Sequence, residues 1–116
     1  MLHFDEGEFT VDFPIGGPEL DDLELVDDVD VFVTLRDGTS WLGVFISLAK
    51  LASSMKVRAE SGELRGGLYH WESGLVIMRQ AGVSAILEAI RDMVAEGDVE
   101  EHLIKQLKDD DPDETS

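Results

Sequence analysis

A chain of 116 residues, 43% of them apolar, is long enough to bury one hydrophobic core and fits a single domain. The chain contains no cysteine, which excludes disulfides, thiol catalysis and zinc sites built on cysteine. Its formal net charge of −17 opposes direct binding to nucleic acid or anionic lipid, because both require Lys and Arg to displace counterions.

The first 30 residues combine a predicted hairpin with an acidic segment. Apolar residues at every second position of residues 9–13 predict a strand, and turn residues 5–7 would bring residues 2–4 back beside it. Residues 14–18 hold two prolines and two glycines and should break regular structure. We expect the acidic segment that follows, residues 19–28, to form a short turn or strand anchored by Leu20, Leu23 and Leu25.

Residues 29–47 carry the clearest local pattern. Apolar and polar side chains alternate from Val29 to Arg36, and a return strand covers residues 40–46. Between them, Asp37-Gly38 supplies the residues that tolerate the positive φ angles of a tight turn. This pattern predicts a β-hairpin.

The middle of the chain predicts a short helix, a loop and two more strands. Ser47 can cap a helix over about residues 48–55, where apolar residues recur at helical spacing. After a loop over residues 60–67 we predict strands at residues 68–71 and 75–78. The second of these strands is apolar throughout, so we expect it in the centre of the sheet with both faces covered.

The pattern after residue 82 is helical. Residues 83–96 place apolar side chains on one continuous face, and a glycine follows that is suited to end the helix. Asp98 and Glu101 match a capping box at the start of a shorter helix that continues to Leu107. Residues 109–116 are acidic and hold too few apolar side chains to pack, which predicts a disordered tail.

These elements predict an α+β fold in one domain over residues 1–108. Because most predicted strands are joined by short turns, we expect a largely antiparallel sheet of about four to six strands. Two or three helices should pack on one face of this sheet.

No recognisable chemical motif accompanies this fold. The three histidines stand outside any metal-binding or catalytic pattern, and the sequence has no nucleophile elbow, phosphate-binding loop or dinucleotide fingerprint. The acidic run at residues 109–114 lacks the spacing of an EF-hand loop. We therefore predict a protein that is not an enzyme and has no cofactor and no metal site.

The distribution of charge is more informative than its total. Residues 1–30 contain eleven acidic and no basic residues, residues 31–79 contain four acidic and six basic ones, and residues 80–116 contain eleven acidic and three basic ones. Adaptation to a saline cytoplasm, or a simple need for solubility, would spread acids over every exposed face. The observed segregation favours a local acidic patch that binds a basic protein.

We expect the acidic residues before the hairpin to form this contact surface. Glu100 and Glu101 would extend the surface if the last helix packs nearby, and Trp41 and Trp71 are the aromatic residues best suited to anchor a partner. The first ten residues show no signal-peptide pattern and no apolar run reaches the length of a membrane span, so we expect a cytoplasmic protein. A homodimer stays open. The five acids predicted to bind the partner are Asp21, Asp22, Glu24, Asp27 and Asp28.

The order of elements resembles that of small acidic bacterial immunity proteins encoded beside polymorphic toxins. The resemblance covers residues 29–104 and implies an α+β protein that inhibits a toxin, such as a nuclease, by binding it and without a catalytic residue. The motifs that carry it are the turn Leu35-Arg36-Asp37-Gly38, the aromatic strand Trp41 to Ile46, Ser61-Gly62-Glu63, Tyr69-His70-Trp71, the apolar strand Leu75 to Met78 and the closing helix 83–96.

Two other functions stay open at this stage. A phage-type inhibitor of a nucleic-acid-binding defence complex would use the same acidic surface. A small-molecule sensor or orphan enzyme domain would instead hold a pocket between sheet and helices, and its acidity would reflect a saline cytoplasm.

Overall fold

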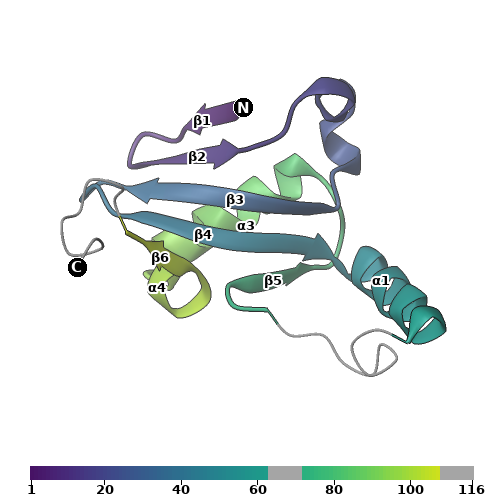
Figure 1. Cartoon of the computed structure of the whole chain (residues 1–116). Helices are drawn as coiled ribbons and strands as arrows, with labels where there is room; N and C mark the ends of the chain where they lie inside the picture. The colour runs from purple at the N-terminus through teal and green to yellow at the C-terminus, as the bar shows by residue number, and fades with distance from the viewer. Residues whose placement is uncertain (63–71, 108–116) are drawn as a thin grey trace.

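The computed structural model describes residues 1–62 and 72–107, which form a six-stranded sheet with helices against it (Figure 1). The sheet order is β1-β2-β3-β4-β5, and β6 pairs with β4. All pairings are antiparallel except that of β4 with β5, so the predicted α+β class with a largely antiparallel sheet is confirmed. The strands are β1 (Leu2–Asp5), β2 (Phe9–Phe13), β3 (Asp28–Leu35), β4 (Ser40–Ser47), β5 (Leu75–Met78) and β6 (Ile104–Gln106).

Both predicted hairpins are confirmed. Gly7 turns β1 into β2 and Gly38 turns β3 into β4, and their φ angles of 90° and 88° lie in the region that favours glycine. Alternate residues of β2 and β3 point to one face of the sheet and are buried there. These buried residues are Phe9, Val11, Phe13, Val29, Val31 and Val33.

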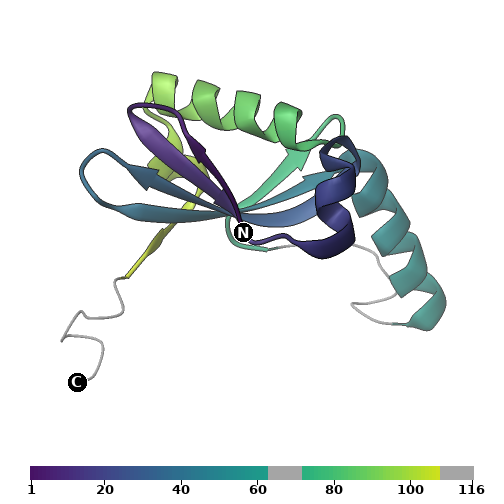
Figure 2. The same cartoon turned by 90° about the horizontal axis from the view of Figure 1, so that it is seen from above.

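Helix α3 (Val83–Glu96) covers the buried face of the sheet (Figure 2). Its apolar side and the inner residues of the sheet form one core that includes Phe45 and Ile90, both fully buried. Gly97 ends the helix at a φ angle of 73°, as predicted. The helical residues buried against the sheet are Val83, Ile86, Leu87 and Ile90.

Helix α1 (Leu48–Ser61) begins where predicted and ends later than predicted. The Ser47 hydroxyl accepts a hydrogen bond from the Lys50 amide (3.1 Å), which is the expected cap. The helix continues to Ser61 and is ended by Gly62, so the predicted loop does not start at residue 60. Only Leu51 of this helix is buried, because α1 extends from the end of the sheet rather than lying across it (Figure 2).

The prediction that both faces of β5 are covered is wrong. Among the described residues β5 pairs only with β4, in parallel, and Ile77 remains 51% exposed. An apolar run of four residues indicates burial of a strand but does not indicate which neighbours it has. The other predicted strand of this pair, residues 68–71, lies outside the described residues.

The prediction of a helix continuing to Leu107 is also wrong. Helix α4 (Val99–His102) is one turn long, and Asp98 makes no side-chain cap to it. The chain then becomes extended, and β6 pairs with residues 40–42 of β4. Since β5 reaches only residues 44–47, the first half of β4 would otherwise leave its backbone groups unpaired on that side. This need for backbone pairing outweighs the weak helical pattern.

One ion pair between distant elements gives the fold a testable pH dependence. Arg91 of α3 donates a hydrogen bond to Glu6 in the β1–β2 turn and lowers the pKa of Glu6 below its ordinary value near 4.5. A lowered pKa adds stability above about pH 4.5, and this stability disappears as the pH falls through the pKa of the folded state.

Replacement of Arg91 by methionine should therefore destabilise the protein more at pH 7 than at pH 3. Urea unfolding midpoints of both proteins at the two pH values measure this difference. Arg36→Met removes the same charge from a largely exposed pair with Glu8 at 3.4 Å, and it should show a smaller pH-dependent difference. Equal behaviour of the two variants would contradict the assignment.

Candidate partner-binding surface

The acidic segment connects β2 to β3 as two short 3-10 helices, η1 (Gly17–Asp21) and η2 (Leu23–Leu25). It is therefore neither the simple turn nor the strand that we predicted. Pro18 lies in the first turn of η1, where its fixed φ angle suits a helix start. Leu23 packs against the core while its neighbours face outward.

Backbone hydrogen bonds fix this segment at one end of the sheet. The Gly82 amide donates to the Val26 carbonyl (2.8 Å) and the Ser47 amide donates to the Asp27 carbonyl (2.9 Å). These bonds connect the segment to the start of α3 and to the end of β4. Figures 1 and 2 show η1, η2 and the start of α1 at this same end. A surface held at two places by backbone hydrogen bonds is organised before any partner arrives.

Glu24 has a structural role that its sequence position does not reveal. Its carboxylate accepts hydrogen bonds from the Ser84 amide (3.3 Å) and the Ser84 hydroxyl (2.9 Å), in the first turn of α3. Gly82 precedes this helix and has no side chain that could cap it. A carboxylate at a helix N-terminus satisfies a free amide and interacts favourably with the helix dipole. Glu24 is thus a remote cap and is not free for a partner.

Replacement of Glu24 by alanine should lower the free energy of unfolding by about 1 kcal/mol, the usual cost of losing a cap. Urea unfolding measures this loss. Hydrogen exchange at the Ser84 amide should speed up, because that amide loses its acceptor. Asp21→Ala, in the same segment but without a described partner, is the control and should leave both readouts unchanged.

The other four predicted acids form, with two leucines, a surface that we call the acidic end. Asp21, Asp22 and Asp28 are exposed and Asp27 is half-buried. Within residues 1–62 and 72–107, none of these four side chains makes an ion pair or a hydrogen bond. The full acidic end comprises Leu20, Asp21, Asp22, Leu25, Asp27 and Asp28.

The acidic end combines apolar and charged surface around a hollow. Leu20 and Leu25 are 46% and 70% exposed, which is unusual for leucine in a folded domain. An open hollow of about 340 Å³ lies beside them, lined by residues of η1, η2 and the start of β3. Its lining consists of Pro18, Asp22, Leu25, Val26, Asp27 and Asp28.

Several acids elsewhere in the first half of the chain have partners within the fold. Glu6 and Glu8 pair with arginines, and Asp12 pairs with His3. Asp37 accepts hydrogen bonds from the hydroxyl and amide of Thr39, which lower its pKa. The carboxylates without described partners in this half therefore gather mainly at and near the acidic end.

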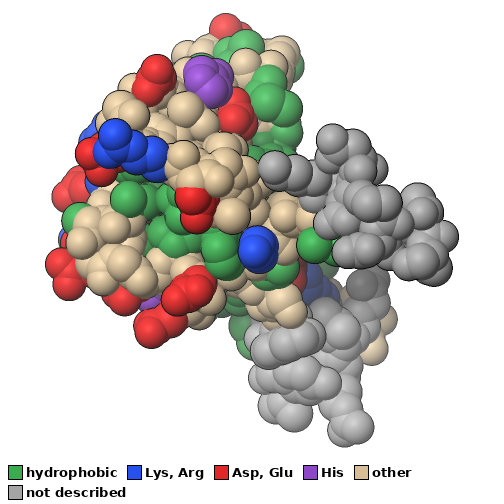
Figure 3. All heavy atoms as spheres, turned by 90° about the vertical axis from the view of Figure 1, so that its left-hand side faces the viewer, with side chains coloured by type: hydrophobic (Ala, Val, Ile, Leu, Met, Phe, Trp, Pro, Cys, Tyr) green, Lys and Arg blue, Asp and Glu red, His purple; other side chains and the backbone are tan. Residues whose placement is uncertain are grey.

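The opposite end of the sheet, which faces the viewer in Figure 3, carries basic side chains among acidic ones. Arg36 lies there beside Glu8, and Lys105 is close enough to Asp37 to help lower the pKa of that carboxyl. Acidic side chains therefore occur at both ends of the sheet, but at this end basic side chains lie among them.

Glu100 and Glu101 do not extend the acidic end. Both are exposed on α4, which follows the C-terminal end of α3, whereas η2 contacts the N-terminal end of α3. The 14 residues of α3 separate these ends by about 20 Å at 1.5 Å per residue. The condition on which we included these two glutamates is therefore not met.

Trp41 also lies at the far end. Its ring is half-buried against the core, and its indole nitrogen donates a hydrogen bond to the Thr39 hydroxyl (2.9 Å). The ring borders a hollow of about 200 Å³ together with Glu100, so these two predicted residues come together but away from the acidic end. Trp71 lies outside the described residues.

Core side chains fill most of the space between sheet and α3, and two open hollows of about 570 and 360 Å³ lie between α3 and the β5 side of the sheet, both lined in part by charged side chains. The described residues contain no group of three or more His, Asp or Glu side chains placed to hold a metal ion, and no helix long and apolar enough to cross a bilayer. Comparisons with protein-family models, with curated proteins and with solved structures found no match to this chain. Functional interpretation therefore depends on the surface.

Proposed function

We propose that this chain binds a basic protein through the acidic end and inhibits it, in the manner of an immunity protein. The observation that supports this proposal is the group of four carboxylates without described partners, which surrounds exposed leucines on a rigid part of the fold. A partly apolar centre with a charged rim is the usual composition of a protein interface. The carboxylates would supply long-range attraction, and the leucines would supply buried area.

The elements that form the acidic end do not weaken its negative electrostatic potential with basic residues. No Lys or Arg occurs in the first 35 residues of the sequence, so η1, η2 and β3 carry no Lys or Arg of their own. A surface of one sign attracts an oppositely charged partner and raises the association rate 10- to 1,000-fold. The likeness in element order to immunity proteins of toxin systems agrees with such a role.

The hollow suits the side chain of an arginine or lysine. Asp22 and Asp28 line it and would pair with a guanidinium or ammonium group, and Leu25 would offer an apolar surface to the methylene groups. Nucleases present such residues to hold phosphates. A carboxylate surface that covers them would block the nucleic acid from binding.

Co-expression tests this function. The probe is any basic protein that a neighbouring gene encodes, produced in a bacterial host alone and together with the wild-type chain. If it is toxic alone, we expect growth to be restored by wild type and not by D21N/D22N/D27N/D28N. Purified wild type should also form a complex with the basic protein, and the variant should not. Equal rescue by both would eliminate the acidic end as the contact surface.

The identity of the captured protein separates two kinds of inhibitor. A toxin whose toxicity is relieved supports the immunity role. A nucleic-acid-binding component of a defence complex, bound through the same four carboxylates, would support the phage-type inhibitor instead. Both depend on the same electrostatic contact, so the variant should fail with either partner.

A further inference from the structure

A hollow that we call the small hollow lies between the β3–β4 turn and the C-terminal end of α3, at the end of the sheet that faces the viewer in Figure 3. Its volume is about 200 Å³. Pockets that hold drug-sized ligands measure roughly 300–1,000 Å³. The small hollow therefore has room for a compound of about the size of one large amino-acid side chain.

Most of the lining of the small hollow is apolar. Val99 is buried, and Leu35 and Val94 are half-buried against the core. The half-buried ring of Trp41 completes this wall, and the hydrogen bond from its indole nitrogen to the Thr39 hydroxyl (2.9 Å) fixes its position. An indole ring offers apolar surface to a ligand and also attracts a cation.

Both charged side chains of the lining are carboxylates, Asp37 and Glu100, and the lining contains no Lys, Arg or His. Asp37 accepts hydrogen bonds from the hydroxyl and the amide of Thr39, which lower the pKa of its carboxyl and keep it ionised at neutral pH. Glu100 is exposed and has no partner among the described residues. Two negative charges therefore border an apolar wall.

The C-terminal end of α3 adds to this negative potential. The carbonyl groups at a helix C-terminus carry partial negative charge, which a basic residue in the last turn stabilises. The last turn of α3 has no basic residue and ends with Glu96, and the next residue, Gly97, lines the small hollow. A cation bound there would take the place of the missing basic residue.

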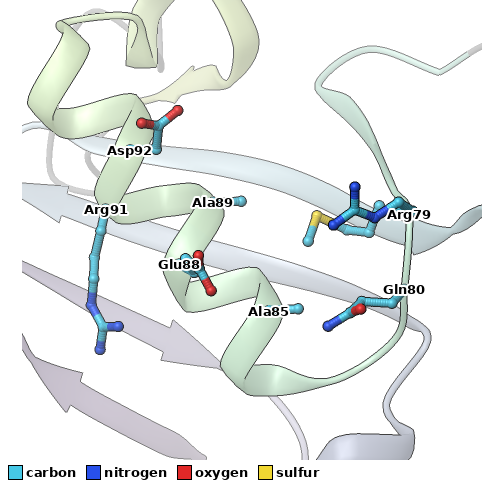
Figure 4. Close-up of a pocket in the computed structure, with 8 residues that line it drawn as sticks. Arg79, Gln80, Ala85, Glu88, Ala89, Arg91 and Asp92 are labelled. Atoms are coloured by element: carbon cyan, nitrogen blue, oxygen red, sulfur yellow. The ribbon is translucent and has the colours of Figure 1, made fainter.

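The larger hollow beside α3, of about 570 Å³, does not favour one sign of charge (Figure 4). Arg79 and Arg91 line it together with Glu88 and Asp92. The small hollow instead combines an apolar wall with charge of one sign. This combination favours a ligand that is apolar over most of its surface and cationic at one end.

We propose that the small hollow binds a free organic ammonium ion of side-chain size. The apolar body of the ligand would lie against Trp41 and Val94, and its ammonium group would lie beside Asp37 and Glu100. A primary amine has a pKa near that of lysine, about 10.4, so it is charged at neutral pH. The small hollow is separate from the acidic end, which lies at the other end of α3.

A free compound suits this place better than the lysine of a protein partner. Arg36 and Lys105 lie at the same end of the sheet, and Lys105 is close enough to Asp37 to help lower the pKa of that carboxyl. Neither of these basic side chains lines the small hollow. They would repel a broad basic surface, whereas a single ammonium ion would meet the two carboxylates of the lining.

Titration of 15N-labelled wild type with 2-phenylethylamine, followed by two-dimensional NMR at pH 7 in 150 mM NaCl, tests this site. The indole N–H signal of Trp41 and the amide signals of residues 94–100 should shift and saturate, with a dissociation constant of about 1–10 mM for so small a ligand. 2-Phenylethanol and 3-phenylpropanoate carry a hydroxyl and a carboxylate on the same apolar body and should bind at least tenfold more weakly. Equal binding of the alcohol, or no shift with the amine, would overturn the proposal.

D37N/E100Q should weaken the binding of 2-phenylethylamine at least tenfold. Asparagine at position 37 still accepts a hydrogen bond from Thr39 and suits the turn, so the hairpin should keep its fold. D21N/D22N/D27N/D28N is the matched control, because it removes four charges at the other end of the sheet and should bind the amine as wild type does. Equal weakening by both variants would show a general attraction of cations to the net charge of −17 and would overturn the proposal, as would unchanged binding by D37N/E100Q.

A peptide probe separates a free compound from a protein side chain as the source of the cation. If the end-blocked peptide Ala-Lys-Ala bound more tightly than 2-phenylethylamine, the small hollow would serve a lysine of a partner and the assignment to a free compound would be overturned. The acidic-end variant is the control in this experiment, so amine binding and partner binding are measured independently. Failure of one proposal would leave the other intact.

Discussion

D21N/D22N/D27N/D28N should fold at least as stably as wild type while associating with the basic partner at least tenfold more slowly. Four like charges within one short segment repel one another, and none has a described partner that would compensate. Their removal therefore relieves repulsion in the monomer. The same change removes the field that guides a cationic partner, which acts mainly on the association rate.

Stopped-flow association at 50 and 300 mM NaCl measures the kinetic part of this prediction. The wild-type rate should fall steeply with salt, and the rate of the variant should be nearly independent of it. Urea unfolding measures the stability part, and its midpoint should be unchanged or higher. Opposite effects on stability and binding are typical of a surface kept for function.

A matched control separates position from total charge. E88Q/E96Q/E100Q/E101Q removes the same four charges from exposed positions of α3 and α4. It should change the association rate by less than about threefold, because three of the four groups, Glu96, Glu100 and Glu101, lie at the end of α3 remote from the acidic end and beyond the Debye length of about 8 Å. If both quadruple variants show the same decrease in association rate, the net charge of the protein and not the position of the charges determines that rate. The acidity would then reflect solubility or a saline environment.

The parts of the fold that depend on neighbouring residues were predictable. The β3–β4 hairpin follows from strict alternation and one Asp-Gly turn, and α3 follows from an apolar face that ends at a glycine. Strand β6 was not predictable. It forms because it pairs with backbone groups in the first half of β4, about 60 residues earlier in the chain, that would otherwise be unpaired. The parallel pairing of β5 with β4 depends equally on residues distant in the sequence, and a run of four apolar residues does not encode it.

The same distinction applies to the site. The count of acids along the sequence located the acidic segment correctly. It could not show that Glu24 caps a helix while the neighbouring acids have no described partner. The partner of Glu24 is Ser84, 60 residues away, and only the packing of η2 on α3 reveals this. The exposure of Leu20 and Leu25 was also unexpected, since leucines between charged residues normally indicate anchors to a core.

The double variant G43A/F45A should be more stable than the sum of its single variants predicts. The Phe45 ring lies over Gly43, and a Cβ atom built on Gly43 would be 2.6 Å from Cε1 of that ring. The ring is fully buried and cannot move aside, so Gly43→Ala should cost about 1–3 kcal/mol through overpacking. Phe45→Ala empties this space and should cost about 3–5 kcal/mol, a large part of the roughly 5–15 kcal/mol that holds a domain together.

In the double variant the new methyl group of residue 43 occupies part of the space that the ring leaves. The coupling energy should therefore be favourable by about 1 kcal/mol or more, as expected for residues in direct contact. Urea unfolding of the four proteins gives this value. The second close neighbour of a Cβ at Gly43, Leu103 Cδ2 at 2.7 Å, provides the control. Leu103→Ala should relieve G43A less than F45A does, because the leucine end can rotate away and the ring cannot. If the effects of Gly43→Ala and Phe45→Ala on the free energy of unfolding were strictly additive, the Phe45 ring would not be the reason that β4 requires a glycine at position 43.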